Sequence, residues 1–515
     1  MRKSSIRLYG PFLAVALLQA LFIAVAPSKA PDRSAVSAAQ GPLGADVTVD
    51  PAANPIDPAT GQMIDPATGQ PMAGGGTGGV GGTAAPGGVG GTAAPGGVVG
   101  AGAVKGDTSH CKNGSQFEIL LLNPPCTPKF VGNNGGTTYQ GVTDKEIKVV
   151  IFSTVSNALV DAALAPQGLA ATPAELDAMY AALQKFAGHY ELYGRKLNVT
   201  RVTGAGCATS PPTVPECKES AREVIKMKPF LVVWATPLYG EVFDEFARAG
   251  IPSIGGWHFD DSYFTQRRPY RYDVFMDGTR TAQMVGEYYC KKMAGKPADH
   301  AGVVIHDTIP GGRLAPRKVA IITPDIDANV RAQRYLMGII SKCDGGKPVV
   351  PITYVSDIER ANEQTEATTA TLIKEKVTTI ICLCDPIAPA FATAYYTKQH
   401  YFPEHLLSGS GLLDYDLLGR LYEPNQWEHA FGPSHLSEPI PFGQTDASRV
   451  WRDVGNSGEP CKSCNLHTGY FVFVAGLLQG AGPNLNPLTM EQGVMGSKPQ
   501  GGFPGTSLIK FGPGD

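Results

Sequence analysis

Short continuous apolar runs alternate with longer amphipathic stretches from residue 147 onward, and this alternation constrains the fold more than any other feature of the chain. Runs of this kind are typical of parallel strands that are covered on both faces by helices. We expect strands at residues 147–152, 196–202, 230–235, 251–254, 318–323, 349–355, 379–383 and 405–408. Eight strands suit two separate sheets, so the sequence predicts an α/β fold with two lobes.

The helices expected between these strands are amphipathic, and the first has the clearest start. Thr172 is placed as an N-cap, Pro173 as the first helical residue and Glu175 as the capping-box glutamate. Apolar side chains then recur at spacings of three and four, at Leu176, Met179, Leu183, Phe186 and Tyr190. Further helices are expected at residues 216–227, 240–249, 279–293, 328–342, 362–376, 388–399 and 468–479.

Residues 1–30 have the pattern of a secretory signal peptide or an N-terminal anchor. Arg2, Lys3 and Arg7 precede an apolar run over residues 12–26. This run is shorter than the roughly 20 residues that span a bilayer, so we expect removal, with a retained anchor as the alternative. The mature protein is therefore expected outside the cytoplasm, secreted or tethered to the cell envelope.

Residues 31–110 contain no aromatic residue and two tandem repeats. The hexapeptide DPATGQ occurs at residues 57–62 and 65–70, and GGVGGTAAP occurs at residues 78–86 and 87–95. Such units have no apolar face to pack, so the composition predicts a disordered Gly/Pro/Ala-rich linker. Residues 111–140 form a cysteine-containing lead-in to the folded region.

The charge balance argues against nucleic acid as a partner. The chain has 43 Lys and Arg against 46 Asp and Glu, a net charge of -3, and no extended basic stripe. Its 515 residues, of which 43% are hydrophobic, suffice for a large core.

Ten cysteines in an exported chain are expected to form disulfides. The neighbours along the chain suggest the pairs Cys111 with Cys126, Cys207 with Cys217, and Cys461 with Cys464, and two predicted helices suggest Cys290 with Cys343. Connectivity does not follow from spacing, so these pairings stay open. Cys382 and Cys384 lie on one face of a predicted strand, too close in sequence to bond to each other.

Parallel sheets bind ligands beyond the carboxyl ends of their strands, so the loops there are the candidate ligand site. The residues that we select have hydroxyl, amide, carboxylate or aromatic side chains, or lie in a glycine turn. They are Ser153, Thr154, Ser156, Asn157, Thr236, Tyr239, Trp257, His258, Asp325, Asp385 and Gly411. Trp257 and His258 could instead be packing residues, and Asp325 and Asp385 could instead cap helices or form turns.

Several segments, in this order, resemble the leucine/isoleucine/valine-binding protein family. They are GVTDKEIKV at residues 141–149, IPSI at 251–254, GKPA at 295–298, and AG at 301–302 leading to RKVAII at 317–322. Over residues 141–479 the chain resembles the extracellular ligand-binding receptors of this family, in particular actinobacterial-type ABC transporter substrate-binding proteins.

The resemblance implies the class I periplasmic-binding fold, with two Rossmann-like doubly wound lobes joined by a hinge. Lobe 1 would comprise residues 141–272 and 435–515, and lobe 2 residues 273–434, with crossings near residues 270–276 and 431–436. A third crossing implies more chain after Asp515. The lobes would close on an amino-acid-like or amide-like solute and deliver it to an ABC permease in the membrane, with the binding protein itself a monomer.

Family members hold the carboxylate of an amino acid with Ser or Thr hydroxyls and backbone N–H groups of lobe 1, and its ammonium with an acid of lobe 2. Thr236 matches the hydroxyl position, whereas Trp257 and His258 stand where small residues are usual. The acidic position falls at Gly411, so Asp385 or Asp325 would have to substitute. An aromatic surface formed by Trp257 and Tyr239 would suit a larger or more apolar solute.

No Walker loop, HExxH or GxSxG motif is present, and we expect a binding protein without catalytic residues, cofactor or metal. Two alternatives stay open. A wall-associated sensory receptor would use the same two-lobed clamp. A thiol-disulfide redox protein would use Cys461 and Cys464, with His467 nearby at the start of a helix.

Overall fold

The structure is a computed structural model that describes residues 106–155, 157–208, 213–234, 240–255, 259–302, 316–428 and 430–511. The expected signal segment and almost all of the expected linker lie outside these residues and stay predictions. Among the described residues, no helix combines the length and the apolar character needed to cross a membrane.

The first lobe contains a five-stranded parallel sheet in the order β2-β1-β3-β4-β5. Its strands are β1 (Glu146–Val155), β2 (Lys196–Ala208), β3 (Leu231–Trp234), β4 (Ser253–Ile254) and β5 (Arg271–Tyr272). Side chains of β1 alternate between two cores. Val149 and Ile151 pack on one face of the sheet, and Val150 and Phe152 pack on the other.

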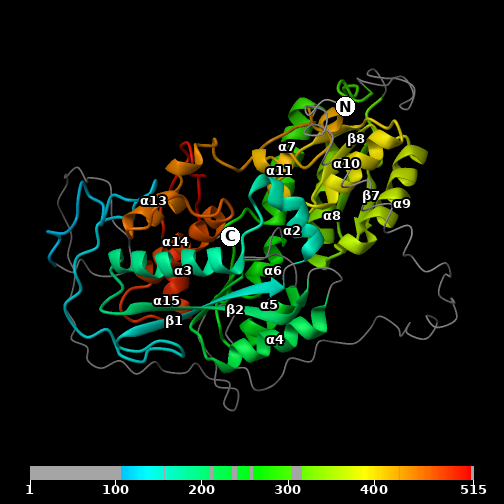
Figure 1. The fold of residues 1–515 in the computed structure, drawn as a ribbon. Helices are drawn as coiled ribbons and strands as arrows, with labels where there is room; N and C mark the ends of the chain where they lie inside the picture. Colours follow the sequence, from blue (N-terminus) through cyan, green and yellow to red (C-terminus); the bar gives the residue numbers. More distant parts are fainter. Residues whose placement is uncertain are drawn as a thin grey trace, which may run out of the picture. The chain divides into compact units, whose positions relative to one another are not determined.

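Helices cover both faces of this sheet, as Figure 1 shows for α3 and α4 on its opposite sides. The core that contains Val149 also contains residues of α3 (Pro173–Phe186), α13 (Asp446–Asp453), α14 (Cys464–Gly480) and α15 (Pro487–Met495). The core that contains Val150 contains residues of α4 (Val214–Lys226) and α5 (Gly240–Arg248). The C-terminal helices therefore belong to the core of the first lobe.

The second lobe repeats the same architecture with the order β10-β9-β8-β6-β7. Its strands are β6 (Val319–Pro324), β7 (Val350–Tyr354), β8 (Thr379–Cys382), β9 (Glu404–Leu406) and β10 (Ala430–Phe431). One core contains Ile321 with α7 (Gly278–Lys292) and α8 (Asp327–Cys343), and the other contains Ile322 with α9 (Ala361–Lys374) and α10 (Ala388–Lys398). The predicted class, two doubly wound α/β lobes, is confirmed.

The start of α3 is formed as its sequence predicts. The backbone N–H of Glu175 donates to Thr172 Oγ1 at 3.2 Å, and the backbone N–H of Thr172 donates to the Glu175 carboxylate at 2.8 Å. Together they form a capping box.

The prediction missed the shortest elements. β5 and β10 have two residues each, so neither contains an apolar run that marks a strand. They lie where the chain was expected to cross between lobes. The short helices α2 (Ala158–Leu164), α6 (Asp261–Thr265), α11 (Asp416–Gly419) and α12 (Pro424–Trp427) have four to seven residues, too few to show a helical repeat, and were also missed. The prediction also missed α13 and α15.

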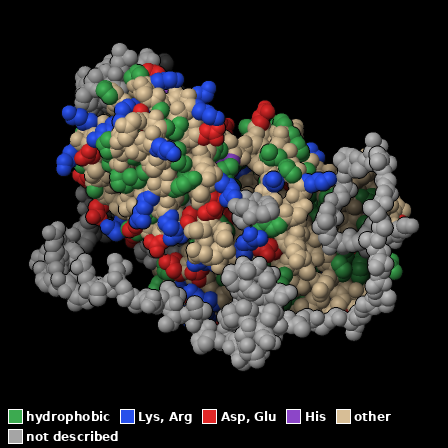
Figure 2. Space-filling view, turned by 180° about the vertical axis from the view of Figure 1, so that it is seen from behind, with side chains coloured by type: hydrophobic (Ala, Val, Ile, Leu, Met, Phe, Trp, Pro, Cys, Tyr) green, Lys and Arg blue, Asp and Glu red, His purple; other side chains and the backbone are tan. Residues whose placement is uncertain are grey.

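Basic and acidic side chains are interspersed on the described surface that Figure 2 shows, without a continuous area of one sign. This distribution agrees with the balanced composition of the chain. The described part of the face in this view has no basic area of the kind that binds nucleic acid.

A buried ion pair joins the beginnings of three strands in the second lobe. Arg317 Nε lies 2.7 Å from Glu404 Oε1, and the two side chains are only 4% and 0% exposed. Arg317 also donates to the carbonyl oxygens of Met293 and Lys296, and Thr379 donates to Glu404. We predict that Arg317→Met lowers the free energy of unfolding by about 3–5 kcal/mol, because it leaves the Glu404 charge buried without a partner.

Urea unfolding measures this loss, and Lys318→Met is the matched control. The neighbouring pair of Lys318 with Glu375 is partly exposed, so its removal is expected to change stability by no more than about 1 kcal/mol. Equal losses for the two variants would contradict the role assigned to the buried pair.

Candidate functional site

The strand order places a switch point in each lobe. In sheets of this order, the connections after two neighbouring central strands run in opposite directions. A crevice therefore opens between these two strands at their carboxyl ends. The crevice lies between β1 and β3 in the first lobe and between β6 and β8 in the second. Most of the predicted ligand residues belong to loops at these two places.

The described first-lobe candidates take part in local structure. Ser153 Oγ donates to the carbonyl oxygen of Val202 at 3.4 Å, and Thr154 lies partly buried in β1. The Asn157 side chain accepts the N–H groups of Leu159 and Val160 and caps α2. The remaining first-lobe candidates, Ser156, Thr236, Tyr239, Trp257 and His258, lie outside the described residues.

Asp385 caps a helix, which was the predicted alternative to a role in ligand binding. Its Oδ2 accepts the Tyr354 hydroxyl at 2.6 Å and the Ser356 hydroxyl at 3.0 Å, and its Oδ1 accepts the N–H groups of Ile387 and Ala388 at the start of α10. Burial, together with the Asp385 charge, raises the pKa of Tyr354, which keeps this hydroxyl protonated as a donor. Asp325 is exposed in the loop after β6.

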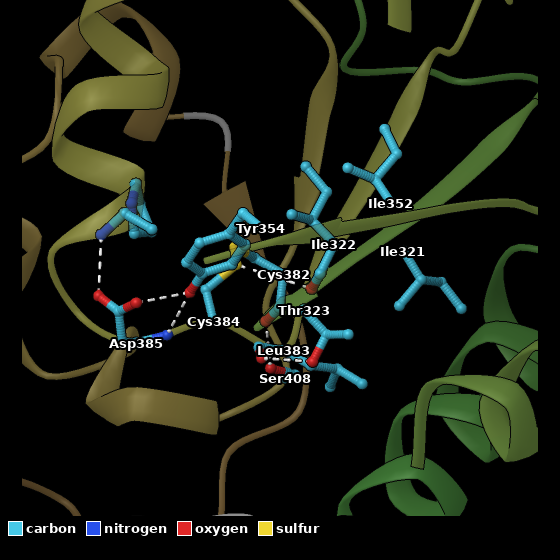
Figure 3. Close-up of a disulfide and its surroundings, with 12 residues drawn as sticks. Ile321, Ile322, Thr323, Ile352, Tyr354, Cys382, Leu383, Cys384, Asp385 and Ser408 are labelled. Atoms are coloured by element: carbon cyan, nitrogen blue, oxygen red, sulfur yellow. Dashed lines mark hydrogen bonds between the residues drawn. A yellow bond between two sulfur atoms is a disulfide. The ribbon is translucent and has the colours of Figure 1, made fainter. Parts of the chain in front are cut away.

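Cys382 and Cys384 are bonded to each other, contrary to our expectation. Two residues in an extended strand would separate the Cα atoms by about 6.6 Å. Here β8 ends at Cys382 and the chain turns, so the Cα atoms lie only 5.0 Å apart. Figure 3 shows the disulfide beside Tyr354, at the carboxyl end of β8.

The structure pairs the other eight cysteines as the sequence suggested, Cys111 with Cys126, Cys207 with Cys217, Cys290 with Cys343 and Cys461 with Cys464. Cys464 is the first residue of α14 and is buried. The helix start that suggested redox chemistry therefore carries a disulfide that is packed into the core of the first lobe.

Gly411 allows a loop to lie against this disulfide. Its φ is 57°, and a Cβ at this position would lie 2.3 Å from the carbonyl oxygen of Cys384. The close approach fixes the path of residues 409–414, which ends at Asp414. Asp414, three residues beyond Gly411, supplies a carboxylate to the second lobe.

A cavity of about 2300 Å³ opens beside these loops. Its lining is mainly apolar and comes from segments that follow β5, β9 and β10, from one face of α14, and from the two ends of the folded chain. These segments are residues 272–277, 412–416, 434–440, 465–480, 121–130 and 505–511. None of the described ligand candidates lines this cavity, so their ligand roles stay predictions.

The two lobes touch on either side of their facing strand ends. Leu164 and Leu169 of the first lobe pack against the second-lobe cluster of Leu413, Leu418 and Tyr422, and α2 lies beside α11 in Figure 1. Asp260 of the first lobe accepts two hydrogen bonds from the Arg331 guanidinium of α8, at 2.7 and 3.0 Å.

Asp414 and His435 line the cavity and make no side-chain hydrogen bond to any other described residue. Both carboxylate oxygens of Asp414 and both ring nitrogens of His435 are buried and unpaired. Burial lowers the pKa of His435, although the nearby Asp414 charge opposes this shift. A buried polar group without a partner costs about 1–3 kcal/mol, so the closed arrangement is penalised until something pairs with them.

Aromatic rings complete this end of the cavity. The Phe275 ring centroid lies 6.4 Å from that of His435 and 6.3 Å from that of Tyr470 on α14. Asp414, Phe275, His435 and Tyr470 were not predicted as site residues from the sequence. The acidic Asp414-Tyr415-Asp416 sequence was the one available signal, because the other residues come from separate segments without a motif.

The cavity also includes Asp273, which follows β5. Its Oδ1 accepts the N–H groups of Val274 and Phe275, and burial raises its pKa to about 7 while the Arg271 charge opposes the shift. Among the described residues, no group of three or more His, Cys, Asp or Glu side chains is arranged to hold a metal ion.

The raised pKa predicts a pH-dependent effect of Asp273→Asn. The folded protein holds this proton more tightly than the unfolded chain, so Asp273 contributes stability below a pH of about 4 that is lost as the pH rises toward 7. We expect the variant to match the wild type at pH 4 and to be more stable at pH 8, by up to about 4 kcal/mol.

Urea unfolding at the two pH values measures this difference. Asp325→Asn, which changes an exposed acid, is expected to show no such dependence. An Asp273→Asn variant that is no more stable than the wild type at pH 8 would contradict the assignment.

A scan against protein-family models and a search of curated proteins found no match. Among solved structures, the chain is similar to a periplasmic binding protein type 1 from Bordetella pertussis, with 14% identity, a TM-score of 0.48, and coverage of 72% of this chain and 92% of that one.

Two further similarities are to proteins with bound solutes. One is the branched-chain amino acid transporter substrate binding protein from Streptococcus pneumoniae in complex with isoleucine, at 13% identity, TM-score 0.47, and coverage of 72% and 93%. The other is an ABC transporter solute binding protein from Rhodopseudomonas palustris in complex with 3,4-dihydroxybenzoic acid, at 13% identity, TM-score 0.46, and coverage of 72% and 89%. Values this low carry no argument about function, which rests on the site itself.

Proposed function

We propose that this chain is the extracytoplasmic solute-binding component of an ABC-type importer and that it has no enzymatic activity. The observation that carries the proposal is a large cavity lined by described residues of both lobes, among them segments that follow β5, β9 and β10. Concave, mostly apolar sites with few polar groups are typical of small-molecule binding. A solute in this cavity would contact both lobes at once.

The unpaired groups make solute binding more favourable in the closed state than in the open state. Asp414 belongs to the second lobe, and His435 lies in the segment that returns from β10 toward the first. Separation of the lobes would expose both to water, whereas closure without solute leaves them unpaired. A solute with hydrogen-bond donors or acceptors at this place would offset that penalty and shift the population toward the closed state.

The compartment and partner belong to the same proposal. Five disulfides suit an oxidising compartment outside the cytoplasm. The expected N-terminal signal segment and linker would direct the protein there and allow its folded part to reach a membrane permease. We expect a monomer that presents the closed form to this permease.

A thermal-unfolding screen of amino acids, amides, aromatic acids, sugars and fatty acids tests the proposal. A cognate solute at 100 times its dissociation constant is expected to stabilise the protein by about 2.7 kcal/mol. We predict that Asp414→Asn and Phe275→Ala each weaken binding by about tenfold or more. Asp325, an exposed acid outside the cavity, is the rival ligand that the sequence offered, and Asp325→Asn is expected to bind as the wild type does if the solute lies in the cavity.

The solute affinities of the three variants are measured by isothermal titration calorimetry. A screen in which no class of solute raises the melting temperature would count against the proposal. So would a solute whose affinity depends on Asp325 but not on Asp414 or Phe275.

A further inference from the structure

One face of α14 lines the cavity along most of the helix. The residues on this face are spaced by three and four, and they are Leu466, Gly469, Phe473, Gly476 and Gly480. From Leu466 to Gly476 the face extends about 15 Å, since each helical residue rises 1.5 Å. The cavity is therefore elongated along α14.

The glycines of this face border open space. A Cβ added at Gly469 or at Gly476 would meet no atom within 4 Å, whereas one at Gly480 would contact Gly493 of α15 at 3.7 Å. Glycine inside a helix is unfavourable relative to alanine, so these positions weaken α14 and widen the cavity beside it. The cavity is wide at these two positions because Gly469 and Gly476 have no side chain to fill the space.

The facing wall is apolar and is held in place by the ends of the folded chain. Phe511 stacks on Phe473, with ring centroids 5.5 Å apart. The backbone N–H of Gly505 donates to the carbonyl oxygen of Glu438, and the backbone N–H of Leu121 donates to Asp446 Oδ1 at 2.7 Å. These contacts tie the C-terminal residues to α14 and to the segment after β10, and they tie the lead-in to α13.

The cavity has polar and apolar parts. Asp414 and His435 supply buried polar groups where the lobes meet, and the face of α14 supplies an apolar surface that continues from Tyr470. At about 2300 Å³ the cavity also exceeds the roughly 300–1,000 Å³ of ordinary small-molecule pockets. A free amino acid would leave most of the apolar surface uncovered.

We propose that the solute is an amphiphile with a long hydrocarbon chain, its polar head at Asp414 and His435 and its chain along the glycine face of α14. The inference rests on the proposed function, because it names the class of solute for the same cavity. The candidate solutes share the long hydrocarbon chain and differ in whether the head group is anionic or cationic.

Calorimetric titration with a homologous series tests the inference. The probes are hexanoate, decanoate and palmitate, the amines of the same chain lengths, and leucine, each below its micelle concentration. Burial of each additional methylene is expected to raise affinity by up to about fourfold. Palmitate or hexadecylamine should therefore bind far more tightly than the six-carbon homologue.

Gly476→Leu provides the structural test, because its side chain would fill the space beside α14. We expect this variant to lose at least about tenfold in affinity for the long-chain probe, while the six-carbon probe is little affected. Gly338→Leu is the matched control, since Gly338 is an exposed glycine of α8 that also has no atom within 4 Å of an added Cβ. Gly469→Val serves if Gly476→Leu fails to fold.

The outcomes separate the inference from the proposed function. Tight binding of leucine without any dependence on chain length would overturn the inference and leave the solute-binding role intact. Long-chain binding that is unchanged in both glycine variants would also overturn it. Failure of every probe, together with failure of all solutes in the thermal screen, would overturn both.

Discussion

The parallel pairing of the strands determines where everything else in this protein lies. Because β1 runs parallel to β2 and β3, and β6 runs parallel to β7 and β8, each sheet collects its carboxyl ends at one edge. Helices must then cover both faces, and the alternating side chains of β1 and β6 pack into separate cores. The edge with the carboxyl ends is left to the loops, and those that follow β5, β9 and β10 line the cavity.

The cavity places two different physical requirements on a solute, one apolar and one polar. Its apolar surface along α14 favours a solute that can be removed from water, whereas Asp414 and His435 are buried polar groups that lack partners. Glycine at positions 469 and 476 gives up helix stability to keep the apolar part wide. A solute that satisfies both demands has a polar end and an apolar end.

The strands and helices with strong patterns could be predicted from the sequence, because buried parallel strands need continuous apolar runs and α3 has a complete capping box. The two-residue strands β5 and β10 could not, since hydrogen bonds to a neighbouring strand form them and no local pattern marks them. The bond between Cys382 and Cys384 depends on a turn after β8 that the apolar run does not reveal.

The candidate site was less predictable than the fold, and the reason is physical. Asp385 was a reasonable ligand candidate, yet four donors occupy its carboxylate in the folded chain. Asp414, His435, Phe275 and Tyr470 come together only when segments after three different strands meet α14. The larger or more apolar solute expected from Trp257 and Tyr239 stays a prediction, because both residues lie outside the described part of the chain.

Hydrogen exchange with and without a bound solute tests the central claim most directly, because it reports on both lobes in one measurement. We predict that a bound solute slows hydrogen exchange in residues 412–416 of the second lobe. Exchange should slow at the same time in residues 434–438 and along α14 of the first lobe. Protection confined to a single lobe, or located at the exposed loop of Asp325 and not along α14, would contradict a cavity shared by the two lobes.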